Sequence, residues 1–131
     1  MKKLIHVAVG VIENGRGEIF VTKRLSHQHQ GGKWEFPGGK VEEGETLLLA
    51  LDRELKEEIG INVTLAEPLL VVEHDYGDKA VKLDVWLVRG FVGQPKGLEG
   101  QEGKWVAIKD IDTLTFPEAN APIVATVKAL Q

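Results

Sequence analysis

Residues 39–61 constrain the fold of this chain more than any other part of its sequence. Within them, residues 46–59 have the spacing of an amphipathic helix. At about 100° per residue, one stripe of that helix is entirely apolar and consists of Leu47, Leu51, Leu55 and Ile59. Thr46 can cap the first turn, and Gly60 can end the helix in a left-handed conformation. We therefore predict a helix whose apolar stripe packs on a core.

The same helix carries three glutamates on one side. Glu57 and Glu58 lie three and four positions after Glu54, so their side chains are neighbours on the helix surface. Clustered carboxylates repel one another unless a positive charge joins them, and a hard divalent cation such as Mg²⁺ supplies that charge. A bare Glu-x-x-Glu-Glu is also common on solvent-exposed acidic faces, so this pattern alone leaves both interpretations open.

The loop before the helix suits an anionic ligand. Gly38 and Gly39 allow the backbone to approach a ligand closely, and the helix N-terminus offers a favourable dipole to an anion. Two divalent cations at the glutamates could hold a diphosphate and activate a water molecule. The segment therefore predicts a cation-assisted site for a phosphorylated substrate.

The rest of the chain predicts a mixed α/β fold. Apolar runs bounded by turn residues predict strands at residues 4–12, 18–24, 34–36, 63–74, 80–92 and 104–108. Asn14-Gly15 favours a hairpin turn between the first two strands, and residues 37–39 are expected to end the third. Pro122 marks the first turn of a helix at residues 122–130. Because strands and helices do not alternate regularly, the class is mixed α/β or α+β.

Composition narrows the class of protein. The 131 residues fit one compact domain, residues 1–131, and the absence of cysteine excludes disulfides and thiolate metal sites. The net charge is −4 without a cluster of Lys and Arg, which argues against binding to nucleic-acid polymers. The apolar run at residues 4–12 is interrupted by His6 and is too short for a membrane span. We expect a soluble, cytoplasmic protein.

The spacing around the glutamates matches a known motif. Gly39 is followed after five residues by Glu45, and after seven more by Arg53-Glu54-Leu55-Lys56-Glu57-Glu58-Ile59-Gly60-Ile61. This pattern resembles the Nudix box at every fixed position. Similarity to the MutT subgroup of the Nudix hydrolases covers nearly the whole chain and includes residues 1–4, 35–40, 99–101 and 116–120. The resemblance implies an α/β/α sandwich around a mixed β-sheet.

The resemblance also implies roles at a hydrolytic centre. It implies that the cation is Mg²⁺, for which Mn²⁺ could substitute. The ligands would be the Gly39 carbonyl and the carboxylates of Glu54, Glu57, Glu58 and Glu99. Either Glu54 or Glu99 would be the general base, and the sequence leaves this choice open. Taken alone, Glu99 would be an ordinary acid of an exposed loop. Arg53 would hold Glu57 in place, and Glu45 would support the junction of loop and helix.

A second set of residues is implied in nucleotide binding: Arg24, His29, Phe36, Lys79 and Asn120. Asn120 would read an oxidised guanine with its amide, although it could equally cap the last helix. Phe36 would offer its backbone. Arg24 is otherwise a surface charge at a strand end, and His29 a solvated loop histidine. Lys79 stands where an arginine lying over the base is expected, and a lysine cannot stack as a planar guanidinium does.

We therefore predict a Mg²⁺-dependent hydrolase of the 8-oxo-dGTP diphosphatase type. It would convert 8-oxo-dGTP to 8-oxo-dGMP and pyrophosphate by attack of water on the β-phosphorus, and so keep the oxidised base out of DNA. The expected partner is a small-molecule nucleotide, bound by a monomer. Two alternatives stay open: a Nudix hydrolase of another nucleoside triphosphate or nucleoside diphosphate derivative, and a non-catalytic Nudix-like domain that binds a nucleotide or a protein.

Overall fold

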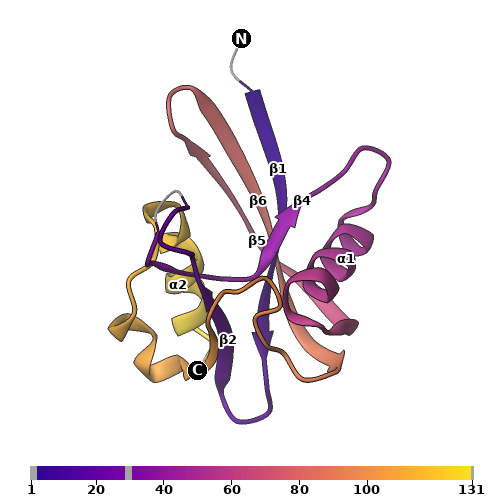
Figure 1. The fold of residues 1–131 in the computed structure, drawn as a ribbon, viewed down its shortest axis with the longest axis vertical. Coiled ribbons are helices and arrows are strands. Elements are labelled where there is room, and N and C mark those ends of the chain that lie inside the picture. The colour runs from indigo at the N-terminus through magenta and orange to yellow at the C-terminus, as the bar shows by residue number, and fades with distance from the viewer. Residues whose placement is uncertain (1–2, 29–30, 131) are drawn as a thin grey trace.

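The computed structural model describes residues 3–28 and 31–130, in which a mixed β-sheet has a helix on each side (Figure 1). The strands are β1 (Lys3–Glu13), β2 (Glu18–Lys23), β3 (Trp34–Glu35), β4 (Gly38–Lys40), β5 (Asn62–Asp75), β6 (Lys79–Val92) and β7 (Gly103–Ala107). The α-helices are α1 (Leu47–Ile59) and α2 (Ala121–Lys128). Two 3₁₀ helices, η1 (Ile108–Thr113) and η2 (Glu118–Asn120), precede α2.

Strand β1 is the branch point of the sheet. The main order is β3-β2-β1-β6-β5, while β4 pairs with β1 and β7 pairs with β2. β1 and β6 run parallel from Lys3 opposite Lys79 to Ile12 opposite Val88, and the other pairs are antiparallel. β2 pairs with β1 only near the C-terminal end of β1, at Ile12 and Glu13. Further back along β1, at residues 7–9, the same edge pairs with β4. One edge of β1 is therefore shared by two strands, β2 and β4.

The two faces of the sheet bury separate apolar cores, because side chains alternate along each strand. On one face, Ala8 and Ile12 of β1 pack with the apolar side of α1. On the other face, Val9 and Val11 pack with α2 and the segment before it, including Ile123. Both helices cover apolar strand residues, which gives the α/β/α sandwich that the resemblance implied.

Helix α1 forms as predicted from its sequence. The Thr46 hydroxyl accepts a hydrogen bond from the Leu49 N–H at 3.2 Å, and Gly60 ends the helix with φ of 77°. The buried residues are Ala50, Leu51, Leu55 and Ile59, whereas Leu47 is half-buried. The apolar stripe is therefore fully buried only after the first turn of the helix.

The segment after β3 differs from the prediction. Residues 37–39 were expected to end a strand at Phe36. Instead β3 ends at Glu35, two residues without regular structure follow, and a new strand, β4, begins at Gly38 and pairs with β1. Glycine is required there, since a Cβ on Gly38 would lie 2.1 Å from the Ala8 carbonyl oxygen.

Helix α2 starts one residue before Pro122 and ends at Lys128 rather than at residue 130. In the described ranges, neither α-helix has the length and apolarity needed to cross a membrane.

Candidate active site

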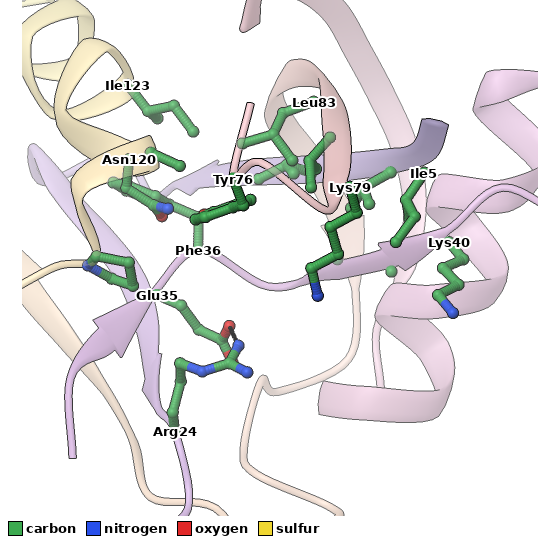
Figure 2. Close-up of a pocket in the computed structure, with 17 residues that line it drawn as sticks. Ile5, Arg24, Glu35, Phe36, Lys40, Tyr76, Lys79, Leu83, Asn120 and Ile123 are labelled. Carbon is green, nitrogen blue, oxygen red and sulfur yellow. Dashed lines mark hydrogen bonds and ion pairs between the residues drawn. The ribbon is translucent and has the colours of Figure 1, made fainter. Parts of the chain in front are cut away.

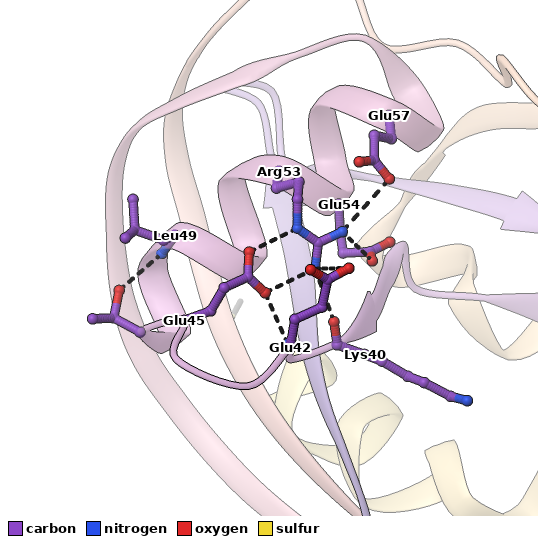
Figure 3. Close-up of polar contacts among 8 residues, drawn as sticks. Lys40, Glu42, Glu45, Leu49, Arg53, Glu54 and Glu57 are labelled. Atoms are coloured by element: carbon purple, nitrogen blue, oxygen red, sulfur yellow. Dashed lines mark hydrogen bonds and ion pairs between the residues drawn. The ribbon is translucent and has the colours of Figure 1, made fainter.

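Arg53 on α1 forms hydrogen bonds with acidic residues of the helix and of the loop before it (Figure 3). Its Nε and Nη2 donate to the two carboxylate oxygens of Glu45 at 2.7 and 2.9 Å, and its Nη1 donates to Glu54 at 2.8 Å. Nη2 also donates to the Lys40 carbonyl at 3.0 Å. The Arg53 hydrogen bonds, aided by the Glu42 N–H, lower the pKa of Glu45 to about 2. The guanidinium thereby fixes helix α1 to β4 and to the loop between them.

The predicted pair of Arg53 and Glu57 is present, together with shorter contacts from Arg53 to Glu45 and Glu54. Arg53 was expected to hold Glu57, four residues further along the helix. The two side chains form an ion pair, with 3.6 Å between Nη1 of Arg53 and Oε2 of Glu57 (Figure 3), and 55% of the Glu57 side chain is exposed. Glu45 and Glu54 take the shorter hydrogen bonds because the loop before α1 folds back over the arginine. Glu45 therefore supports the junction of loop and helix, as expected.

Strand β4 forms the opposite wall of the site. The Gly38 N–H donates to Glu58 at 2.9 Å. A Cβ on Gly39 would lie 2.1 Å from Oε2 of Glu54, so the carboxylate rests directly against the glycine backbone. Two of the three glutamates predicted on α1, Glu54 and Glu58, thus lie against the two glycines of β4.

The loop between β6 and β7 brings Glu99 to the same place. The Leu98 N–H donates to the Glu58 carbonyl at 2.9 Å, and the Gln101 side chain donates to that carbonyl at 3.2 Å. The Gln101 amide oxygen accepts from the Glu99 N–H at 2.7 Å. The loop is therefore docked on the C-terminal end of α1, which places the charge of Glu99 beside Glu54 and Glu58.

The acidic side chains repel one another. Burial raises the pKa of Glu58 to about 8, the Gly38 hydrogen bond opposes this, and the charges of Glu35, Glu54 and Glu99 add to it. Burial also raises the pKa of Glu54, against the effect of Arg53 and with the repulsion of Glu57 and Glu99. A cation among these groups would relieve the repulsion.

The donor chemistry fits a divalent cation. Within residues 3–28 and 31–130, no three carboxylate or histidine side chains already form a group that could hold a metal ion. These carboxylates have other partners: Glu54 accepts from Arg53, Glu58 accepts from the Gly38 N–H, and the largely exposed Glu57 pairs with Arg53.

A cavity of about 350 Å³ opens on the other side of β4 (Figure 2). Its apolar walls come from β1, β6 and α2, namely Ile5, Val7, Val9, Val81, Leu83 and Ile123. Arg24, Lys40, Lys79 and Asn120 supply polar groups. Gly38 and Gly39 line the cavity as well as the acidic site, so β4 is a wall shared by the two.

The cavity brings together four of the five residues predicted to bind a nucleotide. Arg24, Phe36, Lys79 and Asn120 all line it, whereas His29 lies outside the described residues. Asn120 makes no side-chain cap on α2, so the capping alternative is wrong. Its half-buried side chain lies at the cavity instead.

Three of the polar residues that line the cavity were not singled out from the sequence: Glu35, Lys40 and Tyr76. Glu35 lies between the buried Trp34 and Phe36, so strand alternation could have shown that it faces differently from its neighbours. Tyr76 is at the tip of the β5–β6 hairpin, where its backbone N–H donates to the Lys79 carbonyl at 2.8 Å. Lys40 ends β4. No local pattern marked Tyr76 or Lys40, because the cavity is formed by strands distant in sequence.

The fold and site define a class of protein. The NUDIX domain family matches residues 8–126, and the chain belongs to that family. It is a hydrolase that acts on phosphorus anhydrides.

The comparisons narrow the class further. The chain is 43% identical over 130 residues to the 8-oxo-dGTP diphosphatase of Escherichia coli (strain K12), covering 99% of this chain and all of that one. It is 33% identical over 129 residues to the CTP pyrophosphohydrolase of the same strain, covering 98% and 95%. A solved MutT structure, from work on the proteins of Aliivibrio salmonicida and Vibrio cholerae, superimposes with a TM-score of 0.88 at 48% identity, covering 98% of this chain and 100% of that one.

Proposed function

We propose that this protein is a cytoplasmic, monomeric enzyme that hydrolyses free 8-oxo-dGTP to 8-oxo-dGMP and pyrophosphate, using Mg²⁺, for which Mn²⁺ can substitute. One observation carries the proposal. Gly38 and Gly39 line the apolar cavity on one side of β4 and contact Glu58 and Glu54 on the other. A nucleotide with its base in the cavity would have its phosphates at the carboxylates.

The cavity has the chemistry to select a purine. Its walls are apolar, and the Asn120 amide offers both a donor and an acceptor to the edge of a base. An oxidised guanine carries an N7–H donor where guanine has an acceptor, so an amide oxygen can distinguish the two. The Phe36 backbone would complete the contact with the base, and Arg24 and Lys79 would contact the rest of the nucleotide.

The residues that would hold the cation are Glu54, Glu57, Glu58, Glu99 and, through its carbonyl, Gly39. When bound, a divalent cation supplies positive charge that offsets the charge of the phosphate oxygens. The oxygen of a water molecule bonds to the β-phosphorus, and the bond from that phosphorus to the oxygen shared with the α-phosphate breaks. Glu54 or Glu99 takes the proton of the water molecule, and the nucleoside monophosphate leaves.

Pyrophosphate release tests this proposal. The enzyme is assayed with Mg²⁺ on 8-oxo-dGTP, dGTP, the other dNTPs and CTP by pyrophosphate release. Turnover of ADP-ribose, which contains no triphosphate and cannot release pyrophosphate, is followed as AMP formation, and kcat/KM values are compared. We expect a preference for 8-oxo-dGTP over dGTP of at least about 100-fold, equivalent to about 3 kcal/mol of differential binding.

Glu54→Gln and Glu58→Gln should each lose at least about 100-fold in kcat. Full activity in either variant would show that the carboxylate site is not the hydrolytic centre.

The selectivity should reside in Asn120. In Asn120→Ala, the preference for 8-oxo-dGTP over dGTP should fall to within about threefold, because the amide that distinguishes the two bases is gone. The dependence on Mg²⁺ should persist. Asn62→Ala is the matched control, since Asn62 is an exposed asparagine at the start of β5. Unchanged selectivity in Asn120→Ala would place base recognition elsewhere.

A pyrimidine triphosphate is the second candidate substrate, because the chain also resembles a CTP pyrophosphohydrolase over nearly its whole length. Faster turnover of CTP than of 8-oxo-dGTP would select that activity and keep the hydrolytic centre. Turnover of neither 8-oxo-dGTP nor CTP would point to another nucleoside triphosphate or to a nucleoside diphosphate derivative as the substrate.

A further inference from the structure

Glu35 occupies an unusual position in the cavity wall. It is the second residue of β3, and its neighbours Trp34 and Phe36 are both buried in the core on the α2 side. Its own carboxylate lines the cavity and faces Arg24 (Figure 2). A strand residue between two core aromatics is held rigidly, because its backbone is fixed by β2 on one side and by packing on the other.

The carboxylate forms a close ion pair with Arg24. Nη1 of Arg24 and Oε1 of Glu35 are 2.6 Å apart, and only 26% and 27% of the two side chains are exposed. Burial raises the pKa of Glu35, while the charge and hydrogen bond of Arg24 lower it. Charge-assisted hydrogen bonds with this geometry are stronger than neutral ones.

Arg24 is anchored at its backbone, but its side chain is long. The Arg24 N–H donates to the Lys33 carbonyl at 2.8 Å, and its carbonyl accepts from Gly32 at 3.0 Å. Fixing an arginine side chain costs up to about 2 kcal/mol of conformational entropy unless a partner has already oriented it. A guanidinium has five N–H donors, so it can hold a carboxylate and contact a ligand at once.

Glu35 also lies within electrostatic reach of the acidic site. Its charge is the largest of the carboxylate repulsions that raise the pKa of Glu58. Glu35 therefore pairs with the cavity residue Arg24, and its charge also acts on one of the glutamates that would hold the cation. Two roles follow from this place: orienting Arg24, or joining the cation ligands. The hydrogen bond to Arg24 favours the first.

We propose that Glu35 is a positioning residue, which orients the Arg24 guanidinium toward the bound nucleotide and thereby sets nucleotide affinity rather than the rate of hydrolysis. This inference rests on the proposed function in taking the ligand of the cavity to be a nucleotide. It does not depend on the hydrolysis step.

The test measures equilibrium binding of 8-oxo-dGMP in EDTA, together with KM and kcat for 8-oxo-dGTP with Mg²⁺. Glu35→Gln should weaken 8-oxo-dGMP binding and raise KM about tenfold, with kcat within about threefold of the wild type. Glu35→Asp keeps the charge and should recover most of the affinity. Thermal melting checks that each variant is folded.

A double-mutant cycle identifies the route of the effect. Because Glu35 acts through Arg24, the variant Arg24→Ala/Glu35→Gln should bind 8-oxo-dGMP no more weakly than Arg24→Ala alone. Glu13→Gln is the matched control, since Glu13 pairs with Arg89 at 3.1 Å and does not line the cavity. That substitution should leave both KM and binding unchanged.

Three outcomes would overturn the inference: unchanged or tighter 8-oxo-dGMP binding in Glu35→Gln, additive losses in the cycle, or a large loss of kcat at constant KM. The last would place Glu35 among the cation ligands. Failure of the proposed function looks different, because a wild type that binds 8-oxo-dGMP but releases no pyrophosphate leaves the binding measurements fully informative.

Discussion

Two single residues, Gly39 and Arg53, shape the acidic site in different ways, one by lacking a side chain and the other by its hydrogen bonds. Gly39 shows this most clearly: its missing side chain allows the Glu54 carboxylate to rest against the backbone of β4. Arg53 shows the complementary case, since one guanidinium restrains Glu45 and Glu54 together. Neither role follows from residue type alone, because both depend on the distance between β4 and α1.

Replacing Gly39 should therefore disable the site without unfolding the protein. In Gly39→Ala the new methyl group meets the end of a flexible side chain, so Glu54 is displaced and kcat/KM should fall at least about 100-fold, while the melting temperature stays within a few degrees. Gly15→Ala is the control, since a Cβ at Gly15 has no atom within 4 Å. Normal activity of Gly39→Ala would show that Glu54 need not lie against β4.

Glu58 should give the metal-free protein a distinct pH dependence. Its pKa is about 8 in the folded protein against 4.5 for an ordinary glutamate, so between these values the folded state binds a proton that the unfolded chain does not. The wild-type free energy of unfolding in EDTA should thus fall as pH rises from 5 to 8. Glu58→Gln removes the ionisation and keeps an acceptor for the Gly38 N–H.

The measurement is chemical denaturation of both proteins in EDTA at pH 5 and pH 8. At pH 8 the variant should be more stable than the wild type by on the order of 2 kcal/mol, and the difference should be small at pH 5. Saturating Mg²⁺ should stabilise the wild type more than the variant. Parallel pH profiles would mean that Glu58 ionises normally.

At the scale of elements, the site exists because a strand, a helix and a loop meet. β4 pairs with the middle of β1, α1 packs on the same face, and the loop after β6 docks on the C-terminal end of α1. The loop contributes Glu99, although its residues are largely exposed. Its position therefore depends on a small number of hydrogen bonds.

Gln101 should be the residue that holds this loop. Gln101→Ala removes the hydrogen bonds to the Glu58 carbonyl and from the Glu99 N–H, so Glu99 loses its fixed position. We expect kcat to fall about tenfold while the free energy of unfolding changes by about 1 kcal/mol. Gln94→Ala, at an exposed glutamine of the same loop, should change neither. Equal kcat in the two variants would show that the loop is held by its backbone alone.

At the scale of the whole molecule, the sheet separates two apolar cores that support different parts of the site. The core on the α1 side supports the glutamates of α1, and the core on the α2 side forms the floor of the cavity lined by Asn120. Leu51 and Ile123 are fully buried on opposite sides. Only Ile123 also lines the cavity.

Truncation on either side should destabilise the protein equally but affect binding differently. Leu51→Ala and Ile123→Ala should each lower the free energy of unfolding by about 2–5 kcal/mol, because each leaves a cavity in a packed core. Ile123→Ala should also raise KM about fivefold through lost contact with the base. Urea denaturation and steady-state kinetics at low temperature separate the two effects. A matching rise of KM in Leu51→Ala would show that the cores are coupled.

The sequence by itself determined the elements whose signals are local. Helix α1, its Thr46 cap and its Gly60 end followed from spacing and capping chemistry, and the match to the Nudix box identified Glu54, Glu57 and Glu58 as a group. The resemblance also indicated Arg24, Phe36, Lys79 and Asn120, which the structure places around one cavity. Their proposed roles are for the kinetic and binding experiments to decide.

Only the tertiary structure decided the contacts between distant segments. Helical spacing correctly paired Arg53 with Glu57, but the shorter hydrogen bond of Arg53 to Glu45 depends on the path of the loop before α1, which helical spacing does not describe. Capping rules allowed Asn120 on α2, but η2 turns its side chain to the cavity. β4 and the Arg24–Glu35 pair were also hidden, because strand pairing and ion pairing across a sheet depend on register between segments, and no local pattern encodes that register.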